Sequence, residues 1–128
     1  MPSLFTKIVN GEIPAHKILE DDRYLAFLDI RPINPGHALV IPKKEVDYIF
    51  DLDEETLIGL MIFAKKAAGK IRKCVTCERI GIMVAGLEVP HAHVHLVPIK
   101  DVGDLNFSKA KPANGEDLAK LAEQIRRA

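Results

Sequence analysis

Residues 89–98 read Val-Pro-His-Ala-His-Val-His-Leu-Val-Pro and hold three of the five histidines in this 128-residue chain. Histidine alternates with an apolar residue through the middle of the stretch. Because alternate side chains of a β-strand point to the same face about 6.6–6.8 Å apart, this spacing predicts a strand with His91, His93 and His95 on one face. The intervening apolar side chains would then point into the core: Ala92, Val94 and Leu96.

Three imidazoles in register suit two kinds of chemistry. As metal ligands they would converge on one ion, since zinc accepts histidine nitrogens at about 2.0–2.1 Å. In a phosphoryl-transfer site, a neutral central imidazole would attack phosphorus while its neighbours bind the phosphate and protonate the leaving group. Histidine suits this role because its pKa of about 6.5 leaves one ring nitrogen free at neutral pH. The sequence holds no His-Glu-x-x-His or His-x-His-x-Asp-His pattern, yet the residues alone leave both chemistries open.

The composition is that of a globular protein. The chain is 48% hydrophobic and 28% charged, which excludes a disordered or fibrous protein. Its 18 basic and 18 acidic residues cancel, so we expect neither nucleic acid nor a membrane surface as a partner. Two cysteines are too few for a disulfide scaffold. The first residues lack the layout of a signal peptide, and no apolar run reaches the roughly 18 residues of a membrane span, so we expect a cytoplasmic protein.

Short β-like runs alternate with two helical segments. The β-like runs are residues 17–20, 24–28, 37–41, 79–85 and 91–99, most of them bounded by turn-forming residues. Asp53-Glu54-Glu55 begins a helix that should run to about Lys73. Residues 115–127 form an amphipathic helix, with apolar residues at helical spacing: Leu118, Leu121, Ala122 and Ile125. This order predicts the α+β class, a five-stranded antiparallel meander with a long central helix and a C-terminal helix. We expect one domain over residues 1–128, with its core at about 3–99.

The central helix is apolar around much of its circumference. One face combines residues at helical spacing: Leu57, Met61, Ala64, Ala68 and Ile71. Further apolar residues lie off that face: Ile58, Ile62 and Phe63. Such a helix needs burial on more than one side. We therefore expect the sheet to cover one side and a second copy of the chain to cover the other, which predicts a homodimer.

The histidine motif and its flanking motifs resemble the HINT branch of the histidine triad superfamily. Residues 91–97 fit the pattern His-φ-His-φ-His-φ-φ, in which φ is apolar. The other motifs follow in family order: Leu4-Phe5-x-x-Ile8, Gly11-Glu12-Ile13-Pro14, Glu20-Asp21-Asp22, Phe27-x-Asp29-Ile30-x-Pro32 and Gly-His-Ala-Leu-Val-Ile-Pro-Lys-Lys at 36–44. Together they cover about residues 3–99. The resemblance favours phosphoryl transfer over metal ligation.

The resemblance implies a hydrolase or transferase that acts on the α-phosphate of nucleotide conjugates, similar to a purine nucleoside phosphoramidase. His93 would be the nucleophile that forms a covalent nucleotidyl-histidine, and His95 would contact the phosphate and the leaving group. His91 and His37 would orient the nucleophile, and Asp29 would accept hydrogen bonds from the ribose hydroxyls. The purine slot would be lined by six residues, each of which could equally be an ordinary core residue: Leu4, Phe5, Ile8, Phe27, Ile30 and Leu39.

Two departures from the family pattern bear on function. Many bacterial members hold a structural zinc with Cys-x-x-Cys and a histidine, where this chain has Ser3, Thr6 and Glu45. We therefore expect no metal and no other cofactor. Before the triad, Leu87 and Glu88 replace polar residues that help to hold the phosphate in the family. A nucleotide-binding or scaffold dimer with little activity is therefore an alternative, and a metal-dependent hydrolase is a third hypothesis.

Overall fold

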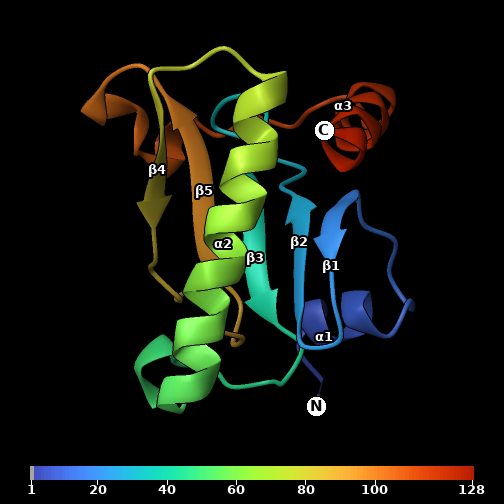
Figure 1. Ribbon diagram of the computed structural model, residues 1–128, viewed down its shortest axis with the longest axis vertical. Helices are drawn as coiled ribbons and strands as arrows, with labels where there is room; N and C mark the ends of the chain where they lie inside the picture. Colours follow the sequence, from blue (N-terminus) through green and yellow to red (C-terminus); the bar gives the residue numbers. More distant parts are fainter. Residues whose placement is uncertain (1) are drawn as a thin grey trace.

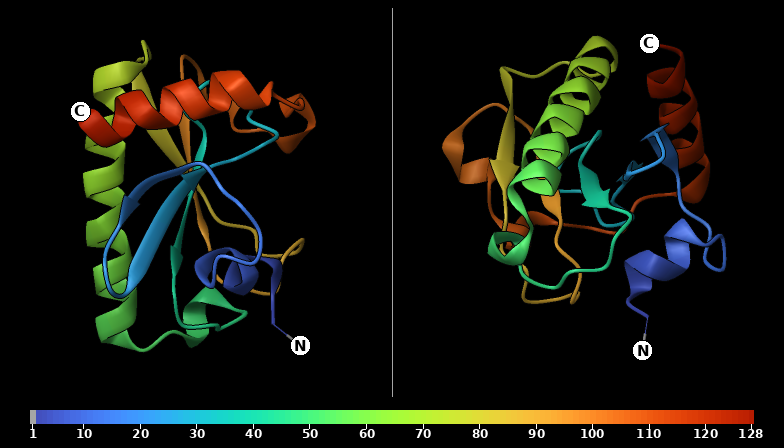
Figure 2. Two further views of the ribbon diagram at one scale, coloured as in Figure 1. Left: turned by 90° about the vertical axis from the view of Figure 1, so that its right-hand side faces the viewer. Right: turned by 60° about the horizontal axis from the view of Figure 1, so that its bottom comes forward.

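The computed structural model describes residues 2–128. A five-stranded sheet lies between a long helix on one side and a short N-terminal helix on the other (Figures 1 and 2). The helices and strands are α1 (Leu4–Val9), β1 (Lys17–Glu20), β2 (Tyr24–Leu28), β3 (Ala38–Pro42), α2 (Glu54–Cys74), β4 (Arg79–Met83), β5 (Val94–Ile99) and α3 (Gly115–Arg127). Three 3₁₀ helices lie in the connections: η1 (Ile49–Asp51), η2 (Val102–Asp104) and η3 (Phe107–Lys109). The expected α+β class, with five antiparallel strands, is confirmed.

The strand order is β1-β2-β3-β5-β4, with every neighbouring pair antiparallel. In a simple meander β4 would lie beside β3 and β5 would form the edge, whereas here β5 lies beside β3 and β4 forms the edge. Burial follows this order, because every residue of the central strand β5 is buried whereas the edge strand β4 carries exposed and half-buried residues. Strand β4 takes the edge after the chain has crossed over through α2.

Strand β5 is shorter than its sequence indicates, which corrects the prediction of a strand over 91–99. Its pairing with β3 begins only at Val94, opposite Val40. The preceding residues are held by other contacts, such as the Ala92 N–H donating to the Val46 carbonyl at 2.7 Å. His91 and His93 thus precede the strand, and only His95 belongs to it. The predicted alternation still holds at the core, where Ala92, Val94 and Leu96 are all buried in one cluster. Two other predicted strands have different bounds in the structure. The strand predicted over 37–41 is observed over 38–42, and the strand predicted over 79–85 is observed over 79–83.

Helix α2 begins where predicted, but the face that it buries is shifted from the predicted one. The Asp53 side chain caps it by accepting the Thr56 N–H at 2.7 Å. Its buried apolar residues are Leu60, Phe63, Ala64, Ala67 and Ile71. The predicted face was Leu57, Met61, Ala64, Ala68 and Ile71, but Met61 is 39% exposed. Tyr24 packs directly over Gly59, where a Cβ would lie 2.0 Å from the Tyr24 Oη, and donates a hydrogen bond to the Thr56 carbonyl.

Helix α3 packs against α2 and β1 and shares the core under α2. It covers residues 115–127 as expected, with the Asn114 side chain accepting from the first turn. Leu118, Ala122 and Ile125 are buried in that core. In the left-hand view of Figure 2, α3 crosses one end of the sheet. Within the described residues, no helix has both the length and the apolarity to cross a membrane.

Helix α1 was not predicted, since the first third of the chain reads as β-like. It forms because Ser3 caps it, its Oγ accepting the Thr6 N–H at 3.0 Å. Phe5 and Ile8 are the buried residues of α1. They join a second core on the other face of the sheet, with Leu25, Phe27, Leu39 and Ile41. The functional residues of the sequence analysis lie on this face.

Candidate active site

Four buried histidines gather beside β3 and β5. His37, His91, His93 and His95 are each at most 6% exposed. The ring centroids of His93 and His95 are 5.0 Å apart, and those of His37 and His95 are 5.2 Å apart. Burying four imidazoles is costly unless their nitrogens are hydrogen-bonded. Their bonds therefore decide which nitrogen of each ring carries a proton.

The ring of His93 is held so that its Nε2 keeps a free lone pair. Its Nδ1 lies 2.7 Å from the carbonyl oxygen of His91. A carbonyl oxygen only accepts, so Nδ1 must carry the proton and Nε2 is unprotonated in the neutral ring. The Phe5 ring packs edge-on against His93, with centroids 5.0 Å apart. These contacts leave on Nε2 the free lone pair that a nucleophile requires.

The ring of His91 is held at both of its nitrogens. Nε2 lies 2.7 Å from the Pro42 carbonyl oxygen and so carries the proton, which leaves Nδ1 to accept from the Ser3 hydroxyl at 2.8 Å. Burial lowers the pKa of His91, although the hydrogen bond to Pro42 works in the opposite direction. His91 is therefore neutral at physiological pH and contributes its backbone carbonyl to His93.

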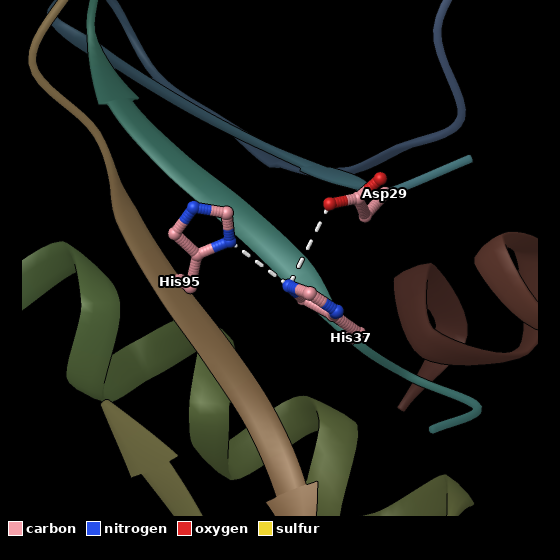
Figure 3. Close-up of side chains that lie close together, drawn as sticks. All are labelled: Asp29, His37 and His95. Atoms are coloured by element: carbon pink, nitrogen blue, oxygen red, sulfur yellow. Dashed lines mark hydrogen bonds and ion pairs between the residues drawn. The ribbon is translucent and has the colours of Figure 1, made fainter. Parts of the chain in front are cut away.

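His37 and His95 form a hydrogen-bonded chain (Figure 3). The Ile33 N–H donates to His37 Nδ1 at 3.0 Å, so the proton of neutral His37 is on Nε2. That Nε2 donates to His95 Nδ1 at 2.9 Å, and His95 consequently keeps its own proton on Nε2. Burial, with the nearby His37 and His93, lowers the pKa of His95 to about 3. Burial also lowers the pKa of His37, and Asp29 opposes that effect.

Asp29, His37 and His95 are the one group of side chains, among residues 2–128, whose atoms lie close enough together to ligate a metal. The nitrogens of His37 and His95 are 2.9 Å apart and the Asp29 Oδ2 lies 3.6 Å from His37 Nε2 (Figure 3). Two histidine nitrogens on one tetrahedral zinc would be about 3.3–3.4 Å apart. The shorter separation is that of a hydrogen bond, so the geometry favours a proton-bearing chain over a metal centre.

The residues in place of the family's structural zinc ligands do not fit that metal. Ser3 and Thr6 offer hydroxyl groups, whereas structural zinc takes cysteine, histidine or carboxylate ligands. Both hydroxyls are hydrogen-bonded, Ser3 to His91 Nδ1 at 2.8 Å and Thr6 to Glu45 Oε1 at 2.6 Å. The observed contacts are those of a hydrogen-bonded cluster of protein groups.

A cavity of about 320 Å³ opens beside His93 and His95. It is lined by all seven residues that the sequence analysis assigned to the nucleotide: Leu4, Phe5, Ile8, Phe27, Asp29, Ile30 and Leu39. Phe5, Ile8, Phe27 and Leu39 also belong to the second core, so they are core residues and wall residues at once. Leu4 and Ile30 are exposed, and Asp29 is half-buried. An apolar slot with one carboxylate beside it is suited to a flat base joined to a sugar.

Glu88 and Leu87, the two residues before the triad that depart from the family pattern, line different cavities. Glu88 lines the cavity, as does Arg31. Leu87 is 93% exposed and lines a second cavity of about 600 Å³, which also touches His93. The sequence reasoning missed Phe107, whose ring in η3 lies 4.8 Å from that of His95. It also missed the contact of Ser3 with His91, because nothing in either local pattern signals a partner 88 residues away.

Comparisons with known proteins agree with the observed fold. The family model named HIT domain matches residues 10–102. A Schizosaccharomyces pombe adenosine 5'-monophosphoramidase is 36% identical over 132 residues, covering 98% of this chain and 96% of the relative. A crystal structure of a Hit-like protein involved in cell-cycle regulation from Bartonella henselae has a TM-score of 0.86 at 33% identity, covering 98% of this chain and 94% of that one.

A second solved structure, a zinc-bound histidine triad family protein from Mycobacterium smegmatis, has a TM-score of 0.82 at 30% identity. It covers 97% of this chain and 90% of that protein. The likeness therefore extends over nearly the whole sequence, including the segments that hold the four histidines. On the combined evidence of the domain match, the relatives and the fold, this chain belongs to the histidine triad (HIT) family.

Proposed function

We propose that the protein hydrolyses conjugates of a purine nucleoside monophosphate at the α-phosphate, with phosphoramidates as the substrate class, through a covalent nucleotide on His93. Family membership and the phosphoramidase name of the S. pombe relative support a nucleotide hydrolase. The observation that carries the covalent step is the 2.7 Å contact between His93 Nδ1 and the His91 carbonyl. It directs the lone pair to Nε2, the atom that must attack phosphorus.

Both half-reactions pass through His93, and His95 acts as a hydrogen-bond donor. His93 Nε2 attacks phosphorus, the bond from phosphorus to the leaving nitrogen breaks, and that nitrogen, hydrogen-bonded to the His95 Nε2–H, takes a proton from solvent. Water then attacks phosphorus, the bond to His93 breaks, and a proton of the water returns to solvent. The net reaction adds one water across the original phosphorus–nitrogen bond. His37 supports this role because its donated hydrogen bond occupies His95 Nδ1 and so keeps the His95 proton on Nε2.

The nucleoside would occupy the cavity of about 320 Å³. The base would lie against Phe5 and Phe27, whose rings pack edge to face at 5.6 Å. Asp29 would accept from the ribose hydroxyls. Its Oδ1 accepts the Arg31 N–H at 2.9 Å, which orients the carboxylate before a ligand arrives. The cavity thus offers apolar walls to the base and a charged acceptor to the sugar.

The direct experiment replaces His93 by Asn and follows adenosine 5'-monophosphoramidate. The wild-type protein should release adenosine monophosphate, and acid quenching should trap protein that carries one nucleotidyl group. His93→Asn should lose both, while it still binds the monophosphate by calorimetry. His16→Asn, at the one histidine outside the site, is the matched control. Turnover retained by His93→Asn would show that the nucleophile is another group.

The second candidate is a nucleotide-binding dimer with little activity, which Glu88 favours. Its carboxylate lines the same cavity as Asp29, and among residues 2–128 the only cationic side chain that lines it is Arg31. Such a lining balances a phosphate poorly. Monophosphate binding by the wild-type protein without product or trapped nucleotide would favour this function. A Glu88→Gln variant that gains activity would show that the carboxylate opposes the reaction.

We also propose a homodimer through the outer face of α2 and the edge strand β4. Ile58, Met61 and Ile62 of α2 are exposed, as is Ile82 of β4. Met61 and Ile82 line the same shallow cavity, so the two exposed apolar patches adjoin. Contiguous apolar surface of this kind typically marks an interface. Sedimentation at micromolar concentration should give twice the monomer mass, and Ile62→Lys should halve it. A wild-type monomer would contradict this proposal.

A further inference from the structure

Three segments that are distant in sequence meet in one hydrogen-bonded group of residues, which we call the Glu45 cluster: Ser3, Thr6, Glu45 and His91. The Glu45 Oε1 accepts the Ser3 backbone N–H and the Thr6 hydroxyl, each at 2.6 Å. The Ser3 Oγ lies 2.8 Å from His91 Nδ1 and accepts the Thr6 N–H at 3.0 Å. Ser3 and His91 are buried, whereas Glu45 lies at the surface. The cluster therefore runs from solvent to the ring of a site histidine.

The shortest contacts in the Glu45 cluster set the direction of its hydroxyl hydrogen bonds. His91 donates from Nε2 to the Pro42 carbonyl, so its Nδ1 must accept and the Ser3 hydroxyl must donate to it. The carboxylate of Glu45 has no proton to give, so the Thr6 hydroxyl donates to it. The other contacts of the Thr6 Oγ1 are longer, 3.3 Å to the Ser3 Oγ and 3.4 Å to His91 Nδ1. The cluster therefore links α1 to the Glu45 carboxylate on one side and to His91 on the other.

The Glu45 carboxylate remains charged at any physiological pH. The Thr6 hydroxyl, and then the Ser3 backbone N–H, lower its pKa to about 2. A charged acceptor makes stronger hydrogen bonds than a neutral one, so it anchors the start of α1 to the chain that follows β3. Two features of the site depend on that anchor, namely the position of Ser3 beside His91 and the position of Phe5 at the cavity wall.

We propose that Glu45, acting through Thr6 and Ser3, is a positioning residue that orients the nucleophile His93. Since the ring of His91 is held at both nitrogens, its peptide group is held as well, and the carbonyl of that peptide accepts the His93 Nδ1–H. The inference rests on the proposed covalent role of His93. It adds that a hydrogen-bonded cluster, built from residues that do not line the nucleotide cavity, keeps the His93 lone pair on Nε2.

The test combines kinetics and histidine NMR on four variants of the full chain. Glu45→Ala and Thr6→Val remove the anchor, Ser3→Ala removes the donor to His91, and Ser3→Thr keeps that hydroxyl. The matched control is Glu123→Gln, which changes a surface carboxylate bonded to Arg127 on α3. Two-bond nitrogen–proton correlations on ¹⁵N-histidine protein report which nitrogen of His91 and His93 carries the proton. Thermal melting checks that each variant is folded.

We expect Glu45→Ala, Thr6→Val and Ser3→Ala each to lower kcat about three- to tenfold, the equivalent of one hydrogen bond, with KM unchanged. Their spectra should show His93 as a mixture of tautomers instead of the Nδ1–H form alone. Ser3→Thr should restore both values, and Glu123→Gln should match the wild type. An increase of KM at constant kcat would overturn the proposal, since the cluster would then hold only the cavity wall.

The outcome also separates this proposal from the proposed function. If the wild-type protein shows no turnover, the proposed function fails, but the spectra still decide whether the Glu45 cluster orients His93. A His93 tautomer that is the same in Glu45→Ala, Ser3→Ala and the wild type would overturn the positioning role. A mixed tautomer in these variants, restored by Ser3→Thr, would support it.

Discussion

Acid should destabilise this fold through His95 well above the pH at which carboxylates titrate. Burial lowers the pKa of His95 from its ordinary 6.5 to about 3. At pH 5 the unfolded chain therefore binds a proton at this position and the native protein does not, so acid favours the unfolded chain. The linkage between the two pKa values gives a loss of about 2 kcal/mol between pH 7 and pH 5. Stability from this group is complete above about pH 6.5 and is lost progressively toward pH 3.

Urea unfolding of the wild type and of His95→Gln at pH 7 and pH 5 measures this contribution. His95→Gln removes the titrating ring, so its free energy of unfolding should fall about 2 kcal/mol less over the same pH range. Burial also lowers the pKa values of His37 and His91, which adds to the acid sensitivity of both proteins in the same direction. An equal loss in the two proteins would refute the reasoning, because His95 would then be protonated as easily when folded as when unfolded.

Three further predictions concern the ribose contact, the core and the metal. Asp29→Asn should raise KM about tenfold for a ribonucleoside phosphoramidate, because the variant loses a charged hydrogen-bond acceptor. The increase in KM should be much smaller for the 2',3'-dideoxy analogue, and an equal increase for both substrates would contradict the ribose role. Gly59→Ala should lower the free energy of unfolding in urea by about 1–3 kcal/mol, because its Cβ would collide with the Tyr24 ring, and an unchanged urea midpoint would contradict that packing. EDTA should leave turnover of the phosphoramidate unchanged, whereas activity lost to EDTA and restored by zinc would support a metal-dependent hydrolase.

The sequence by itself determined the features that depend on local pattern. The alternation from His91 to Leu96 placed the histidines and the apolar residues on opposite sides, and that separation holds although the strand begins only at Val94. Helices α2 and α3 also begin where their acidic first turns and capping residues indicate, since a cap satisfies backbone N–H groups within a few residues.

Tertiary structure decided what depends on partners far along the chain. Helix α1 is six residues long, and its capping residue Ser3 also contacts His91, which is 88 residues away. Helical spacing alone allows more than one apolar stripe on α2, and the packing of the helix on the sheet, with Tyr24 over Gly59, decides which stripe is buried. The free lone pair of His93 is likewise a consequence of where the His91 carbonyl lies after folding. A histidine motif names the residues, but only packing determines which nitrogen holds each proton.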